Sequence, residues 1–137
     1  MKDTSLERAS NDIDTPPASF VKDARDLAVF KKAFGISLEI HKASLTFPKI
    51  EQFALADQLR RCSKSVCANL AEGFSKQKYS RADFGRYIAI AEASAGETQV
   101  WLQYAFCLEY ISDLDFKRWD NDYFSIKAML YKLRKSL

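Results

Sequence analysis

The residues most suggestive of chemistry are a few polar side chains in the middle of the chain. Asn69 and Glu72 lie in the segment ANLAEG, and Glu97 follows in the next apolar stretch. Two carboxylates that face each other in a cleft could act as general acid and base. The same residues could instead pair with Arg60 or Arg61 and form a polar joint that fixes register between helices or subunits. We favour this joint, formed by Arg60, Asn69, Glu72 and Glu97, because buried charges are usually paired, and we predict no catalytic residue.

One histidine and three cysteines are the other side chains with chemistry of their own. His41 has no second histidine with which to share a metal, and a packed ring with one hydrogen bond is expected there. Cys62, Cys67 and Cys107 lack the CxxC spacing of a metal site. Five residues separate Cys62 from Cys67, about 140° on a helix, so the two thiols point to different surroundings. We therefore predict small core residues, no metal and no cofactor, in a reducing, cytoplasmic compartment.

Positive charge is concentrated in one part of the chain. The whole chain carries +3, whereas residues 60–86 contain seven basic and two acidic side chains. The residues that we assign to nucleic-acid binding are Arg61, Lys64, Lys76, Lys78, Arg81 and Arg86. Some of this charge should be paired within a helix, as between Asp57 and Arg61 or between Glu72 and Lys76. Contact with phosphates and a merely solvated rim both remain open.

Four helices must position these side chains. Residues 1–22 are polar and acidic and predict a disordered leader. Apolar residues at three- and four-residue steps then predict helices over residues 23–45, 49–74, 81–111 and 115–137. Pro48 separates the first two helices, Gly73 is expected to stop the second, and Ser80 with Asp83 is expected to start the third. We predict one all-α domain over residues 23–137, an antiparallel up-down four-helix bundle, without a run of ~18 apolar residues that could span a membrane.

Apolar residues cover two stripes of the first helix and a wide arc of the third. In the first, one stripe consists of Leu27, Phe30, Phe34, Leu38, His41 and Leu45, and a second beside it of Val29, Ala33, Ile36 and Ile40. In the third, Val100, Tyr104, Leu108 and Ile111 widen the face formed by Phe84, Ile88, Ala91, Ala95, Leu102 and Ala105. The third helix thus carries more apolar surface than one bundle needs, which predicts self-association.

Several segments in a fixed order resemble a known family. The stretch SLEIHKASLTFPKIEQFALADQLRRCSKSVCANLAEGFS, followed by FGRYIAIAEASAGET and CLEYI, is similar to the 23S rRNA-intervening-sequence proteins, a four-helix-bundle family. The family pattern of an aromatic-proline turn, an RR pair, an ANxAEG motif and a small-residue patch with a Glu falls on Phe47-Pro48, Arg60-Arg61, residues 68–73 and residues 93–97. The chain departs from it at His41, where tyrosine is common, and at Thr98, where an apolar residue is common. The resemblance covers about residue 29 to the C-terminus.

The resemblance implies a homopentamer of four-helix bundles without assigned enzymatic activity, often encoded in insertions within bacterial 23S rRNA genes. A related branch, the accessory variability determinant of diversity-generating retroelements, binds nucleic acid and a reverse transcriptase. We therefore expect a non-enzymatic oligomer that binds structured nucleic acid, RNA or DNA, or a nucleoprotein partner through a basic rim. The alternative is a protein-interaction scaffold with no nucleic-acid role.

Overall fold

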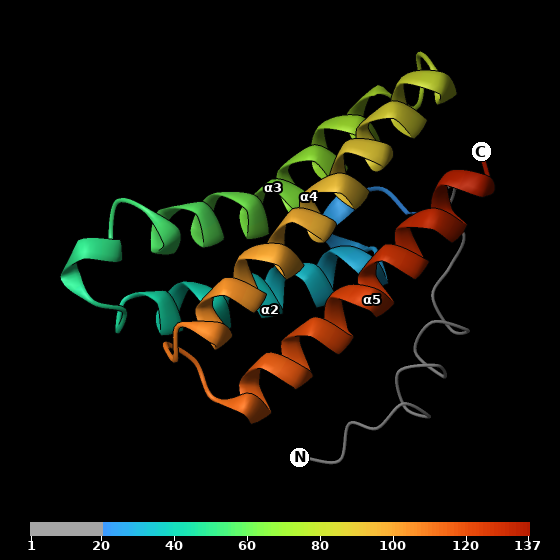
Figure 1. Cartoon of the computed structure of the whole chain (residues 1–137). Coiled ribbons are helices and arrows are strands. Elements are labelled where there is room, and N and C mark those ends of the chain that lie inside the picture. The colour runs from blue at the N-terminus through green and yellow to red at the C-terminus, as the bar shows by residue number, and fades with distance from the viewer. Residues whose placement is uncertain (1–20) are drawn as a thin grey trace.

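The computed structural model describes residues 21–137 and is helical over most of them. The four α-helices are α2 (Ala28–Ser44), α3 (Leu55–Lys76), α4 (Arg81–Cys107) and α5 (Asp113–Lys135). Consecutive helices run antiparallel in an up-down bundle (Figure 1). Both α2 and α4 pack against α3 and α5, so α2 and α4 lie diagonally opposite each other. The described part of the chain contains no strand, and none of its helices has the length and hydrophobicity needed to cross a bilayer.

Short 3-10 turns account for the largest differences between predicted and observed helix limits. Turn η2 (Ala24–Asp26) and an extended Leu27 precede α2, which therefore begins five residues later than predicted. Turn η3 (Lys49–Glu51) follows Pro48, and α3 begins only at Leu55. The predicted leader lies outside the described residues except for its last two, of which Val21 packs against the core.

Side-chain caps define where α4 and α5 begin. Ser80 accepts a hydrogen bond from the backbone N–H of Asp83 at 3.1 Å, as predicted. Ser112 accepts one from the backbone N–H of Asp115 at 3.0 Å. α4 ends at Cys107 rather than at residue 111, because Glu109 adopts a φ of 65°, which a helix does not allow.

The prediction that Gly73 stops the second helix is wrong. α3 continues to Lys76, and Gly73 is buried within it without a positive φ. A Cβ atom placed on Gly73 would lie 2.5 Å from Cβ of Tyr87 and 3.1 Å from Cδ1 of Phe84. Gly73 therefore allows close approach between α3 and α4. The glycine is needed for packing between the two helices and does not mark the end of α3.

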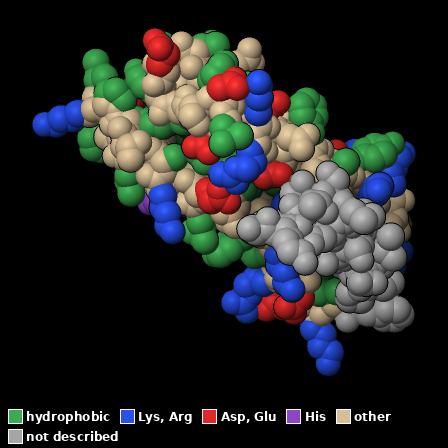
Figure 2. All heavy atoms as spheres, turned by 90° about the horizontal axis from the view of Figure 1, so that it is seen from below, with side chains coloured by type: hydrophobic (Ala, Val, Ile, Leu, Met, Phe, Trp, Pro, Cys, Tyr) green, Lys and Arg blue, Asp and Glu red, His purple; other side chains and the backbone are tan. Residues whose placement is uncertain are grey.

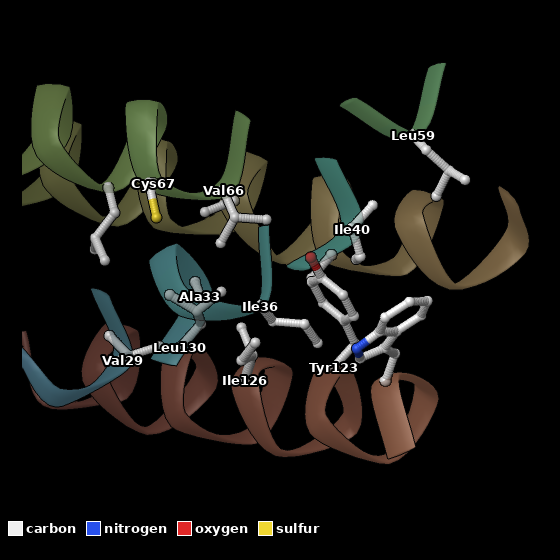
Figure 3. Packing of buried hydrophobic residues seen from close by; sticks show 14 of the residues in the cluster. Val29, Ala33, Ile36, Ile40, Leu59, Val66, Cys67, Tyr123, Ile126 and Leu130 are labelled. Carbon is white, nitrogen blue, oxygen red and sulfur yellow. The ribbon is translucent and has the colours of Figure 1, made fainter. Parts of the chain in front are cut away.

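The core shows which of the two apolar stripes of α2 is buried. Figure 3 shows Val29, Ala33, Ile36 and Ile40 of α2 among side chains of α3 and α5, and all four are buried. The first stripe is divided, because its members Phe34, Leu38 and Leu45 are exposed. Since α3 and α5 are the two helices that pack most against α2 within residues 21–137, one narrow arc of the helix is buried and the other apolar residues face outward.

The hydroxyl of Tyr123 is a defect in this core. Tyr123 is fully buried between the helices (Figure 3), and among the buried polar side-chain atoms of residues 21–137 its hydroxyl oxygen is the one without a hydrogen-bond partner. The hydroxyl of Thr98 instead donates to the carbonyl oxygen of Ser94 at 2.8 Å. Burial accordingly raises the pKa of Tyr123 far above its ordinary value.

We expect Tyr123→Phe to raise the free energy of unfolding by about 1–2 kcal/mol, because the variant keeps the ring and removes a hydroxyl that loses its hydration on folding. Urea unfolding followed by circular dichroism measures this difference. Tyr131→Phe is the control, because that side chain is half-exposed and its hydroxyl is not a buried atom without a hydrogen-bond partner. A less stable Tyr123→Phe variant would contradict the prediction and indicate that the hydroxyl is hydrogen-bonded.

Candidate nucleic-acid interface

The structure divides the six predicted basic residues into two groups. Lys76, Lys78, Arg81 and Arg86 surround the turn between α3 and α4 and are called the basic rim below. Figure 1 shows this turn projecting at the end of the bundle where the C-terminus also lies. Arg61 and Lys64 lie earlier on α3, and the twelve residues from Lys64 to Lys76 correspond to roughly 18 Å of helix.

Backbone hydrogen bonds hold the basic rim in a tight turn. The N–H groups of Tyr79 and Ser80 both donate to the carbonyl oxygen of Lys76 at 2.9 Å. Ser80 then caps α4 through the N–H of Asp83. The first turn of α4 follows at once, and the free N–H groups of a helix start favour anions. Local hydrogen bonding thus places basic side chains and backbone amides at one end of the molecule.

Aromatic rings, rather than carboxylates, neighbour both lysines of the basic rim. The ammonium of Lys76 lies 5.9 Å from the ring centroid of Tyr87, and that of Lys78 lies 5.2 Å from that of Tyr79. The predicted ion pair between Glu72 and Lys76 is not formed among the described residues; Glu72 instead accepts a hydrogen bond from the Tyr87 hydroxyl at 3.4 Å. Within residues 21–137, neither ammonium group therefore forms an ion pair with an acid.

The two arginines of the basic rim differ in their partners. Arg86 pairs with Asp83 through Nη2 and Oδ1 at 2.6 Å, at a place where the arginine side chain is largely in water and the aspartate side chain is partly exposed. Such exposed pairs contribute little to stability, so Arg86 can exchange this partner for another anion at small cost. Arg81 is exposed and forms no ion pair within residues 21–137.

Arg61 and Lys64 make other contacts. Arg61 lies 3.9 Å from Asp57, the (i, i+4) pair expected from the sequence. Lys64 donates from Nζ to Nδ1 of His41 at 2.9 Å, and because an ammonium can only donate, the ring must accept as the neutral form. Desolvation, with the nearby charges of Lys64 and Arg60, lowers the pKa of His41. His41 is thus a half-buried ring with one hydrogen bond, as the sequence predicts.

Arg60 organises the connection between α2 and α3. Its guanidinium donates from Nη2 to the backbone oxygen of Gln52 at 2.6 Å and from Nη1 to Oγ of Ser44 at 2.9 Å. The amide of Gln52 donates in turn to the backbone oxygens of Ser44 and Phe47 at 2.9 and 3.1 Å. Within the described chain these contacts satisfy Arg60 without a carboxylate, so its predicted pairing with Glu72 or Glu97 is not found inside one subunit.

The other three polar-joint residues are not gathered at one place. Asn69 donates to Oγ of Ser65 at 2.8 Å, and Ser65 contacts Oγ of Ser94 on α4 at 2.9 Å. Glu72 reaches α4 through Tyr87, whereas Glu97 accepts from Nε1 of Trp101 on its own helix at 3.0 Å. Asn69 and Glu72 therefore link α3 to α4 through hydroxyl groups. Both glutamates are exposed, and a role in a joint between subunits stays a prediction.

The two cysteines in the core have thiols of low reactivity. Cys62 and Cys67 are buried, and desolvation raises their pKa values to about 11 and about 12 respectively. Since the thiolate is the nucleophile and the metal ligand, these two thiols act as small core residues, as predicted. Cys107 is exposed. Residues 21–137 contain no group of histidine, cysteine and acidic side chains placed to hold a metal ion.

Apolar surface remains uncovered on two opposite helices. Val100 and Tyr104 of α4 and Leu108 just after it are about half exposed, as the sequence predicts, whereas Ile111 partly packs against the core. A shallow hollow of about 350 Å³ lies among Val100, Gln103, Tyr104 and Cys107. Phe34 and Leu38 form the exposed apolar face of α2. The two faces point to different sides of the bundle, because α2 and α4 are diagonal neighbours.

The last turn of α5 contains Lys132, Arg134 and Lys135, which extend the positive surface at the end of the bundle that carries the basic rim. The sequence analysis assigned these three residues no ligand. A Cβ atom on Gly85 would lie 3.9 Å from Leu137, and Arg134 pairs with Glu92 of α4 at 2.6 Å. These contacts place the last turn of α5 beside the first turns of α4. A basic last turn also complements the helix dipole, and the antiparallel order of the helices brings it to the same end of the bundle as the turn between α3 and α4.

Comparisons with known proteins agree with this fold. A family model described as 23S rRNA-intervening sequence protein matches residues 25–132. A crystal structure of a protein of unknown function from the S23 ribosomal protein family of Bacteroides thetaiotaomicron VPI-5482 is 29% identical, with a TM-score of 0.68, and the match covers 78% of this chain and 98% of that one. The search of curated proteins found no match. The chain belongs to the 23S rRNA-intervening sequence protein family.

Proposed function

We propose that the protein is a non-enzymatic homo-oligomer that binds nucleic acid, alone or in a nucleoprotein partner, through the basic rim. The observation that carries this proposal is the placement of Lys76 and Lys78 over tyrosine rings around the exposed start of α4, beside Arg81, which forms no ion pair with the described residues. Cations that carry no paired carboxylate can bind phosphate without first losing a partner. On the face shown in Figure 2, by contrast, Lys and Arg side chains are interspersed with Asp and Glu.

Self-association would multiply this modest positive charge. The apolar faces of α2 and α4 point to different sides of the bundle, and contact between one face and the other on the next copy would be head-to-tail, which closes into a ring when the rotation allows. Five copies is the number that the family resemblance implies. Each copy would then contribute its basic rim to a shared surface, and several weak contacts to one strand act together.

The test is replacement of Lys76, Lys78 and Arg81 by glutamine in one variant. Each phosphate that the variant no longer neutralises should reduce the log–log slope of affinity against salt by about 0.9 on duplex DNA or about 0.7 on a single strand. Removal of three such cations predicts a slope smaller by roughly 2 to 3, with weaker binding at low salt. Fluorescence anisotropy at several salt concentrations measures both quantities, and light scattering checks that the oligomer is intact.

The control variant carries the same charge change elsewhere. Lys31, Lys42 and Lys49 are exposed and lie outside the basic rim, so their replacement by glutamine should leave the slope nearly unchanged. Equally weakened binding in the two variants would indicate a response to net charge rather than a site. A parent protein that binds neither RNA nor DNA at low salt would eliminate the nucleic-acid proposal.

A protein-interaction scaffold is the second candidate, favoured by the connection between α2 and α3. Ile50 and Phe53 are 84% and 96% exposed there, although Arg60 and Gln52 hold the connection in place. A preorganised apolar tip suits a protein partner, because little conformational entropy is lost on binding. Its affinity would change little with salt, which separates it from phosphate binding.

A further inference from the structure

We propose that the basic rim takes single-stranded nucleic acid, or the unpaired segments of a structured one, with bases stacked on Tyr79 and Tyr131. This inference rests on the proposed function and names its ligand class. Both rings are exposed and each has a cation beside it, at the same end of the bundle. Stacking on an aromatic ring requires an open base face, which a continuous duplex does not offer.

Tyr79 lies at the outermost part of the basic rim. Its side chain is 81% exposed, while its backbone is fixed by the hydrogen bond from its N–H to the carbonyl oxygen of Lys76. The Lys78 ammonium lies 5.2 Å from the ring centroid. A large ring held in water by a rigid turn contributes nothing to the core. It is therefore available for an external ligand, and the adjacent ammonium can bind a phosphate of the same strand.

Tyr131 repeats this arrangement at the end of α5. The Arg134 guanidinium lies 5.3 Å from its ring centroid and the Lys135 ammonium 5.7 Å away, while the ring remains about half exposed. Arg134 is anchored by its bidentate pair with Glu92 of α4 at 2.6 and 3.3 Å. The guanidinium therefore fixes the position of the Tyr131 ring relative to α4 and to the basic rim.

The spacing of the two rings suits a short strand. Tyr79 immediately precedes α4 and Tyr131 lies near the level of Glu92, so about eleven residues of α4, roughly 16 Å, separate them along the helix axis. Single-strand sites that combine stacking with a basic groove cover roughly four or more nucleotides. Arg81 and the first N–H groups of α4 lie between the rings, where the phosphates of a strand joining two stacked bases would pass.

Acidic groups are present along the same path. Glu92 is occupied by Arg134 and Asp83 by Arg86, both at 2.6 Å. With these two pairs neutral, the path carries five positive charges, from Lys76, Lys78, Arg81, Lys132 and Lys135, and one negative charge, from Glu72. The path between the rings thus carries a positive excess.

The experiment compares two labelled probes of similar phosphate number, a 20-nucleotide oligo(dT) and a blunt-ended ten-base-pair DNA duplex without unpaired bases. Fluorescence anisotropy should show tighter binding of oligo(dT) by the parent oligomer. Tyr79→Leu and Tyr131→Leu should each weaken oligo(dT) binding by roughly 5- to 150-fold, while the salt slope and duplex affinity stay near those of the parent. Tyr79→Phe keeps the ring and should bind like the parent. Phe53→Leu, a control at the opposite end of α3, should have no effect.

The outcomes separate this inference from the proposed function. Absence of binding to either probe at low salt overturns both. Binding of both probes with equal affinity, unchanged in the leucine variants, overturns the stacking inference and leaves phosphate binding in place. Tyr131→Leu could instead change the oligomeric state measured by light scattering, while the fraction that remains assembled binds oligo(dT) as tightly as the parent. That result would place Tyr131 in a subunit contact and overturn its role in stacking.

Discussion

Gly73→Ala is expected to destabilise the protein by roughly 3 kcal/mol, although alanine is ordinarily the better helix former. The added methyl group would lie 2.5 Å from Cβ of Tyr87, and that atom is attached to the backbone of α4 and cannot rotate away. Relief requires α3 and α4 to move apart, which would loosen the most extensive helix pair of the bundle. Urea unfolding followed by circular dichroism measures the decrease in stability.

The matched control is Gly35→Ala, because Gly35 also lies inside a helix but has open space around the position of a Cβ atom. There the substitution should stabilise the protein by about 0.5–1 kcal/mol through helix propensity. Stability changes of opposite sign at the two glycines would separate the effect of the contact between α3 and α4 from the intrinsic helix propensity of alanine. Equal stabilisation at both positions would mean that α3 and α4 do not approach this closely.

Gly73 shows why the sequence predicted some features correctly and not others. Ser80 and Asp83 were identified as a helix start because a cap involves residues three positions apart, and the structure contains that hydrogen bond. The function of Gly73 depends on Tyr87, which lies on another helix. A glycine near a polar stretch is typical of a helix end, and without the partner helix the two roles look alike.

The candidate site shows the same limit. The pair of Asp57 with Arg61 follows from spacing on one helix, and it is present. Glu72 and Lys76 have identical spacing, but both contact Tyr87 of α4 instead of each other. The Lys76 ammonium lies over the Tyr87 ring, and the Tyr87 hydroxyl donates a hydrogen bond to Glu72. A tertiary neighbour thus replaces a local ion pair worth only a few tenths of a kcal/mol. Arg60 is likewise satisfied by Gln52 and Ser44 rather than by an acid.

The apolar face of α4 was predicted because a helix with a wide apolar arc needs more cover than three neighbours provide. Val100, Tyr104 and Leu108 indeed remain exposed on the single chain, next to the hollow beside Cys107. Periodicity could identify this excess surface, but it could not identify what covers it. The exposed Phe34 and Leu38 of α2 offer a surface of the same character on the opposite side.

A variant that combines Val100→Asp with Tyr104→Asp is expected to convert the proposed oligomer into a folded monomer. The two side chains are about half exposed in the single chain, so the bundle should keep its helicity, whereas two unpaired carboxylates in each subunit contact would be stripped of their hydration on assembly. A cost of several kcal/mol per contact would weaken association by a factor of roughly 1,000 or more.

Size-exclusion chromatography with light scattering at micromolar concentration distinguishes the two states, and circular dichroism checks the fold. Leu114→Asp places one carboxylate on an exposed apolar residue at the start of α5, outside this face, and should leave the oligomer intact, whereas Val100→Asp or Tyr104→Asp alone adds the same single charge on the face and should weaken it. A parent protein that is already monomeric would refute the proposed self-association. An oligomer that survives in the double variant would move the subunit contact away from α4, because a surface that accepts two buried carboxylates without weakening is not an apolar interface.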